Sequence, residues 1–198
     1  MIVFGITGGS GSGKTSVSKM LEKLGVHIID TDVIAHEIVE PNSDCLNELV
    51  NYFGDSILND DKTLNRKKLA SIAFSDKLKT EALSNITHKY IKAEVVKDIN
   101  TTDAELVGID GAVIIGSNVE PLCEFIVSVI ADKQSRITRI KTRDNITDEQ
   151  AIQRINAQND DEFYKENSMY IIYNNGDITQ LESDVVGLFN KIKGNSFE

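Results

Sequence analysis

Short apolar runs alternate with amphipathic stretches along much of this chain. The runs cover residues 2–6, 26–29, 106–109, 125–131 and 170–173. They are nearly continuous in apolar residues, which is typical of parallel strands buried on both faces. Apolar residues recur at helical spacing over residues 14–24, 133–142 and 178–192. Strands that alternate with helices predict an α/β fold, in which helices flank a five-stranded parallel sheet.

The stretch between the second and third predicted strands is too long for a simple crossover, since it holds roughly 70 residues. Apolar residues at helical spacing lead to Gly54, which is a plausible end for a helix. Two more apolar stripes, around Leu69 and Leu83, predict further helices. We therefore predict a helical insertion over 33–100, where a second substrate would bind, within a core formed by 1–32 and 101–198.

A second irregular region separates the last two predicted strands. Thr147 and Gln150 stand at the two positions of a capping box, and a helix over 148–158 would follow. This helix would project between the fourth and fifth strands, so residues 145–165 are predicted to form a short lid.

The first predicted strand runs directly into a glycine-rich turn that opens a helix. Its sequence, Gly8-Gly9-Ser10-Gly11-Ser12-Gly13-Lys14-Thr15, matches the phosphate-binding pattern G-x-x-x-x-G-K-[ST] in the required setting. Glycines allow the backbone N–H groups to point at a phosphate, and the helix adds the positive end of its dipole. Gly9 to Thr15 are therefore predicted to bind a nucleoside triphosphate, with Lys14 on the outer phosphates and the Thr15 hydroxyl on Mg²⁺. The alternative is a glycine turn that only joins a strand to a helix.

Three aspartates follow predicted strands, at the sheet edge where open α/β folds bind ligands. The second strand ends in Asp30-Thr31-Asp32, and the third ends in Asp110. One of the first two carboxylates can orient an attacking hydroxyl while the other caps the next helix, although both could be caps. Spacing alone does not distinguish them. Asp110 is predicted to reach Mg²⁺, directly or through water; the alternative is an ordinary turn residue.

Basic residues are few, so their positions carry information. Arg136, Arg139 and Arg143 share one face of a predicted helix, where they could bind phosphates or form a solvated surface. In the insertion, Arg66 is either a surface charge or an anion contact. His88, near Lys92, belongs to a residue type that is more often structural than catalytic.

Composition limits the classes of partner. The 198 residues include 21 basic and 31 acidic ones, a formal charge of −10 that disfavours nucleic acids and anionic membranes. Two distant cysteines and three scattered histidines predict no structural zinc and fit a reducing compartment. No apolar signal region is seen, nor any apolar run near the roughly 20 residues of a membrane span. We expect a cytoplasmic protein that is a monomer or a weak homo-oligomer.

Taken in order, several motifs resemble those of dephospho-CoA kinases across nearly the whole chain. They are the segments 7–15, 30–32, 35–36 and 64–66, then His88, Arg143-Asp144, and 154–158. The resemblance implies a P-loop kinase fold and transfer of the ATP γ-phosphoryl group to the ribose 3′-hydroxyl of dephospho-CoA.

The resemblance also implies roles for individual residues. Asp32 would be the base, and Arg66 and His88, with Lys92 nearby, would bind the acceptor. Arg143 would be the lid-side arginine, with Arg139 also on the nucleotide side, and Asn175 would lie in the loop beside the adenine.

Three segments depart from the family pattern. Gly111 to Gly116 replace a Val-Pro-Leu-Leu-like stretch, Lys89 stands where proline is usual, and residues 159–162 make the lid acidic. A P-loop kinase for another nucleoside or nucleotide, or a non-catalytic nucleotide-binding module, therefore stays open as an alternative.

Overall fold

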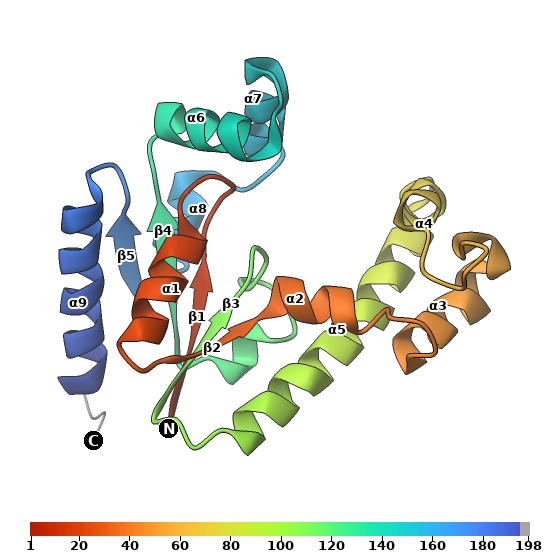
Figure 1. Ribbon diagram of the computed structural model, residues 1–198, viewed down its shortest axis with the longest axis horizontal. Coiled ribbons are helices and arrows are strands. Elements are labelled where there is room, and N and C mark those ends of the chain that lie inside the picture. Colours follow the sequence, from red (N-terminus) through yellow and green to blue (C-terminus); the bar gives the residue numbers. More distant parts are fainter. Residues whose placement is uncertain (195–198) are drawn as a thin grey trace. The chain divides into compact units, whose positions relative to one another are not determined.

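The structure is a computed structural model, and it describes residues 1–194 (Figure 1). The chain forms two compact units. The first joins Met1–Ile29 to the residues from Thr102 onward, and the second is Asp30–Thr101.

The first unit is built on a five-stranded parallel sheet. Its strands are β1 (Ile2–Thr7), β2 (His27–Asp30), β3 (Leu106–Asp110), β4 (Phe125–Ile130) and β5 (Tyr170–Tyr173). They lie in the order β2-β3-β1-β4-β5. The predicted sheet is therefore confirmed. Because β1 lies between β3 and β4, the strand order reverses beside it, which is where doubly wound sheets bind ligands.

Helices α1 (Lys14–Lys23) and α9 (Ile178–Gly194) cover the same face of this sheet (Figure 1). Val17 and Leu21 of α1 and Leu181 and Val185 of α9 pack with buried strand residues such as Phe4. This core holds the first turn of α1 directly after β1, so the intervening loop has little freedom.

Between β4 and β5 the chain forms α6 (Lys133–Asp144), α7 (Asp148–Asn156) and α8 (Asp161–Glu166), while η2 (Glu120–Leu122) precedes β4. The predicted capping box is confirmed, with Thr147 and Gln150 bonded reciprocally. Ile140 and Ala151 are fully buried in a small core between α6 and α7. The sequence did not predict α8, and α7 ends two residues before the expected position.

The second unit is helical: α2 (Thr31–Glu37), α3 (Asp44–Phe53), η1 (Asp55–Ile57), α4 (Arg66–Ala73) and α5 (Lys77–Thr101). The long α5 packs against α2, α3 and α4. As predicted, α3 ends at Gly54, whose φ of 85° suits a residue without a Cβ. Among residues 1–194, no helix has both the length and the apolar character that crossing a bilayer requires.

Candidate active site

The glycine-rich loop lies at the carboxyl end of β1 and opens onto α1. Gly11 and Gly13 have φ values of 78° and 96°, a backbone region that other residues rarely adopt. Gly13 caps α1 without any side-chain hydrogen bond, so the first N–H groups of α1 are available to bind an anion. The Ser12 hydroxyl is buried and has no hydrogen-bond partner among the described residues. A bound phosphate would satisfy the N–H groups at the start of α1, so the loop suits the triphosphate of ATP.

Lys14 forms an ion pair with Asp110, in which Nζ donates to Oδ1. β1 and β3 are neighbours in parallel register, so Asp110 lies beside Ile6, just before the loop. Only 3% of Asp110 is exposed. The buried carboxylate thus holds the lysine ammonium at the loop, where the predicted phosphate site lies.

Two arginines of α6 support the loop from its outer side. Arg136, only 5% exposed, donates from Nε to the Ser10 carbonyl at 2.9 Å. Arg139 donates from Nη1 to the carbonyl oxygens of Gly11 and Ser12, both at 3.2 Å. Arg136 is therefore buried against the loop, and the alternative of a solvated surface does not hold for it. In this structure the guanidinium of Arg139 is bonded to the loop backbone. Its predicted contact with ATP stays a prediction.

Asparagine residues after β5 complete the support of the loop. The buried Asn174, which sequence reasoning did not assign, donates from Nδ2 to the Ser12 carbonyl at 2.8 Å. Its neighbour Asn175 accepts a hydrogen bond from the Asp132 N–H at 2.7 Å. Asn175 thus lies at the start of α6, and its predicted position beside the adenine is not tested by these contacts.

Arg143 ends the arginine face of α6 and binds its neighbour Asp144. Arg143 Nε and Nη2 contact the two carboxylate oxygens at 2.8 and 2.9 Å, and Arg154 of α7 bonds to the same carboxylate. These hydrogen bonds, with that of Arg143 the largest cause, lower the pKa of Asp144 from its ordinary value to about 2. The carboxylate is therefore ionised at neutral pH and holds both guanidinium groups at the junction of α6 and α7.

In the second unit the paired aspartates differ. Asp30 accepts hydrogen bonds from the Asp32 and Val33 N–H groups, at 2.8 and 3.1 Å, and so caps α2. Asp32 lies in the first turn of α2 and is exposed. One of the two predicted tasks, the cap, therefore belongs to Asp30.

The predicted acceptor residues also lie in the second unit. Arg66 is the exposed first residue of α4, and His88 and Lys92 stand one turn apart on α5, both half-buried. Lys89, one of the departures from the family pattern, forms an ion pair with Glu48 at 2.7 Å. This hydrogen bond is the largest cause of the lowered pKa of Glu48, and it raises the pKa of Lys89. Lys89 thus links α5 to α3.

Comparison with known proteins decides between the kinases that share this loop. A sequence profile of the family described as dephospho-CoA kinase matches residues 2–180. The chain belongs to the dephospho-CoA kinase family. The predicted resemblance and enzyme class are therefore confirmed at family level.

Individual relatives agree over nearly their whole length. Dephospho-CoA kinases of Lactobacillus johnsonii and Listeria monocytogenes are 34% and 35% identical to the chain. These alignments cover 95% and 91% of the chain, and 96% and 92% of the relatives.

Solved structures agree as well. The dephospho-CoA kinase of Campylobacter jejuni superposes with a TM-score of 0.69 at 26% identity, and the alignment covers 98% of both chains. A protein from Thermus thermophilus reaches a TM-score of 0.84 at 25% identity, covering 96% of this chain and 97% of that one. A shikimate kinase from Bacteroides thetaiotaomicron, 18% identical with a TM-score of 0.56, shares the fold; 97% of this chain and 98% of that one are covered.

Proposed function

We propose that this chain transfers the γ-phosphoryl group of ATP to the ribose 3′-hydroxyl of dephospho-CoA. The observation that carries the proposal is the loop at the end of β1, where the buried Asp110 holds Lys14 beside the start of α1. In a chain of this family, such a loop is expected to bind the triphosphate. The acceptor oxygen would form the new bond to phosphorus as the bond to the bridging β–γ oxygen breaks, releasing ADP.

The loop and the start of α1 would act mainly by holding charge in place. Phosphoryl transfer spreads negative charge over the equatorial oxygens, and positioned donors stabilise this charge. Lys14 and the N–H groups at the start of α1 would supply these donors. Asp32, in the first turn of α2, would orient the acceptor hydroxyl and accept its proton.

Magnesium is the metal that this chemistry would use. The described residues contain no cluster of three or more His, Cys, Asp or Glu side chains that could hold a metal. Mg²⁺ is commonly held by one or two protein oxygens together with substrate phosphates, so a preformed cluster is not required. The Thr15 hydroxyl and Asp110 are oxygen donors of the right kind to hold the ion, which would neutralise part of the phosphate charge.

Arg143→Lys is expected to lower kcat by more than it weakens ATP binding. Lysine keeps the positive charge but lacks the two-pronged guanidinium that suits a transferring phosphoryl group. Steady-state kinetics and the Kd for ATP measure the two effects separately. If only the Kd changes, Arg143 binds the ground state. If neither changes, Arg143 acts only at the surface, through Asp144.

The acceptor is tested by a panel of hydroxyl compounds incubated with ATP and Mg²⁺. Dephospho-CoA should give ADP and a 3′-phosphorylated product in equal amounts, whereas nucleosides and nucleoside monophosphates should give little. Faster turnover of another acceptor would replace the proposed substrate. ATP binding without transfer to any acceptor would favour a non-catalytic nucleotide-binding module.

A further inference from the structure

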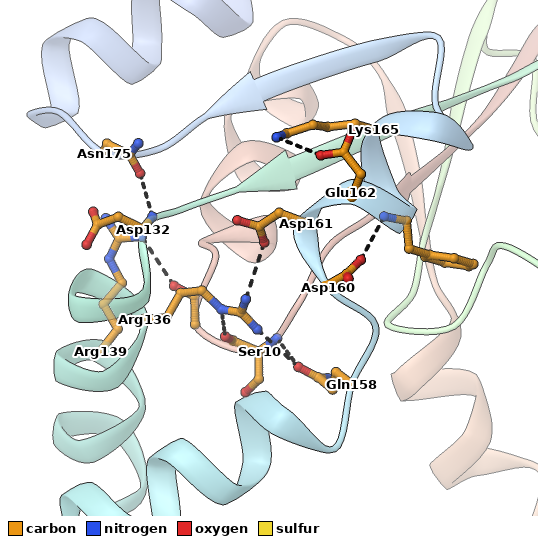
Figure 2. A network of polar contacts seen from close by, with 12 residues as sticks. Ser10, Asp132, Arg136, Arg139, Gln158, Asp160, Asp161, Glu162, Lys165 and Asn175 are labelled. Carbon is orange, nitrogen blue, oxygen red and sulfur yellow. Dashed lines mark hydrogen bonds and ion pairs between the residues drawn. The ribbon is translucent and has the colours of Figure 1, made fainter.

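Both backbone polar groups of Ser10 are held by side chains from distant parts of the first unit. Ser10 N–H donates to Gln158 Oε1 at 2.7 Å, and the Ser10 carbonyl accepts from Arg136 Nε at 2.9 Å. Arg136 Nη2 also donates to the same Gln158 oxygen at 3.4 Å. Figure 2 shows the three residues close together, with Ser10 between Arg136 and Gln158.

The same network reaches the predicted lid. Gln158 lies in the connection between α7 and α8, and Asp161, the first residue of α8, forms an ion pair with Arg136 Nη1 at 3.5 Å (Figure 2). Arg136 therefore bridges the loop on one side and the beginning of α8 on the other. Because its charge is buried, losing these partners would leave a guanidinium unpaired, which is costly.

The loop backbone also packs directly against Arg136. A Cβ added at Gly9 would come within 2.4 Å of Arg136 Nη2, and one at Gly11 within 2.7 Å of the Arg136 carbonyl. Glycine at these two positions thus allows contact with α6 as well as the tight turn. A loop this rich in glycine has high conformational entropy when unsupported, so its shape depends on such contacts.

We propose that Gln158 and Arg136 are positioning residues that hold Ser10, and with it the phosphate-binding loop, in the conformation that accepts the triphosphate. The Ser10 N–H is bonded to Gln158, whereas the N–H groups at the start of α1 are left for the phosphates. The α7–α8 connection thereby takes part in forming the nucleotide site. This inference rests on the proposed kinase function, because its readout includes phosphoryl transfer.

Gln158→Ala tests the proposal, with Gln153→Ala as the matched control, because Gln153 is an exposed glutamine on α7. Loss of one hydrogen bond that positions the loop should lower kcat about three- to tenfold and weaken ATP binding to a similar extent. The KM for dephospho-CoA should stay unchanged. Exchange of the Ser10 amide hydrogen, followed by NMR, should become faster in Gln158→Ala and stay unchanged in Gln153→Ala.

Gln158→Glu provides the conservative comparison, because its carboxylate keeps an oxygen for the Ser10 N–H. It should restore slow exchange and ATP affinity close to that of the wild type. A merely structural role predicts that Gln158→Ala changes only the melting temperature. Unchanged Ser10 exchange together with unchanged ATP affinity in Gln158→Ala would overturn the proposal.

The Arg136 contribution is measured by combining Arg136→Lys with Gln158→Ala. Both side chains hold the same residue, so their effects on ATP affinity should be non-additive, whereas additive effects would remove Arg136 from the proposal. If Arg136→Lys does not fold, exchange and ATP affinity in the Gln158 variants decide alone. Wild-type protein that binds ATP but does not phosphorylate dephospho-CoA would refute the proposed function, while these same two measurements would still test the positioning role.

Discussion

Replacing Lys14 by alanine is expected to abolish measurable phosphoryl transfer. The ammonium stabilises charge that develops on the transferring group, and the loss of one such donor typically costs about 10²- to 10³-fold in kcat. For Lys14→Ala the loss of kcat should reach or exceed the upper end of this range, because Lys14 carries a full charge and lies at the phosphate-binding loop. Single-turnover kinetics with saturating ATP and dephospho-CoA measures the chemical step directly.

The structure adds a second consequence, for stability. Lys14→Ala would also remove the ion-pair partner of the buried Asp110 carboxylate, and removing one member of a buried pair costs about 3–5 kcal/mol. Lys14→Ala should therefore also lower the melting temperature. Adding Asp110→Asn replaces the buried carboxylate by a neutral amide, so the double variant should regain stability without regaining activity.

Lys19 provides the control for the first prediction. It is an exposed lysine on the same helix, α1, and Lys19→Ala should retain normal kcat and melting temperature. A folded Lys14→Ala protein with near-normal kcat would refute the assignment of the phosphate-binding loop.

Asp32→Asn is expected to lower kcat by roughly 10²- to 10⁴-fold, with ATP binding little changed. An ordinary aspartate has a pKa near 3.9, so it cannot deprotonate a ribose hydroxyl before attack. The proton should leave late, while the phosphoryl group is already transferring. Asparagine keeps the size and one acceptor oxygen of Asp32, but it cannot take up that proton.

Asp30→Asn is the matched control, because the structure shows that Asp30 caps α2. Asp30 caps α2 through two backbone N–H groups, and asparagine is also a good N-cap, so the change should cost about 1 kcal/mol or less. Measuring kcat and melting temperature for both variants separates chemistry from capping. A fast Asp32→Asn enzyme, beside a stably folded but inactive Asp30→Asn enzyme, would reverse the two assignments.

Local patterns were sufficient for much of the fold. The five strands follow from nearly continuous apolar runs, and the three inner strands, β1, β3 and β4, are the ones that are largely buried. The phosphate-binding loop and the capping box at Thr147 are equally local, because their geometry depends on residues within a few positions of one another.

Local patterns were ambiguous where two side chains of one type stand close together. Asp30 and Asp32 have the same chemistry and similar neighbours in the sequence, so either could cap the helix. Only the dihedral angles of the folded chain show that the helix begins after Asp30.

The partners of buried polar groups were decided by the tertiary structure alone. Helical spacing placed Arg136 and Arg143 on one face of α6, yet Arg136 is buried against the loop and Arg143 is exposed. Spacing reports which residues share a face, but the packing of neighbouring elements determines what that face meets. Ser10 lies 126 residues from Arg136 and 148 from Gln158. Such contacts arise because the sheet order places β4, and the helices that follow it, beside β1, and no local pattern contains that order.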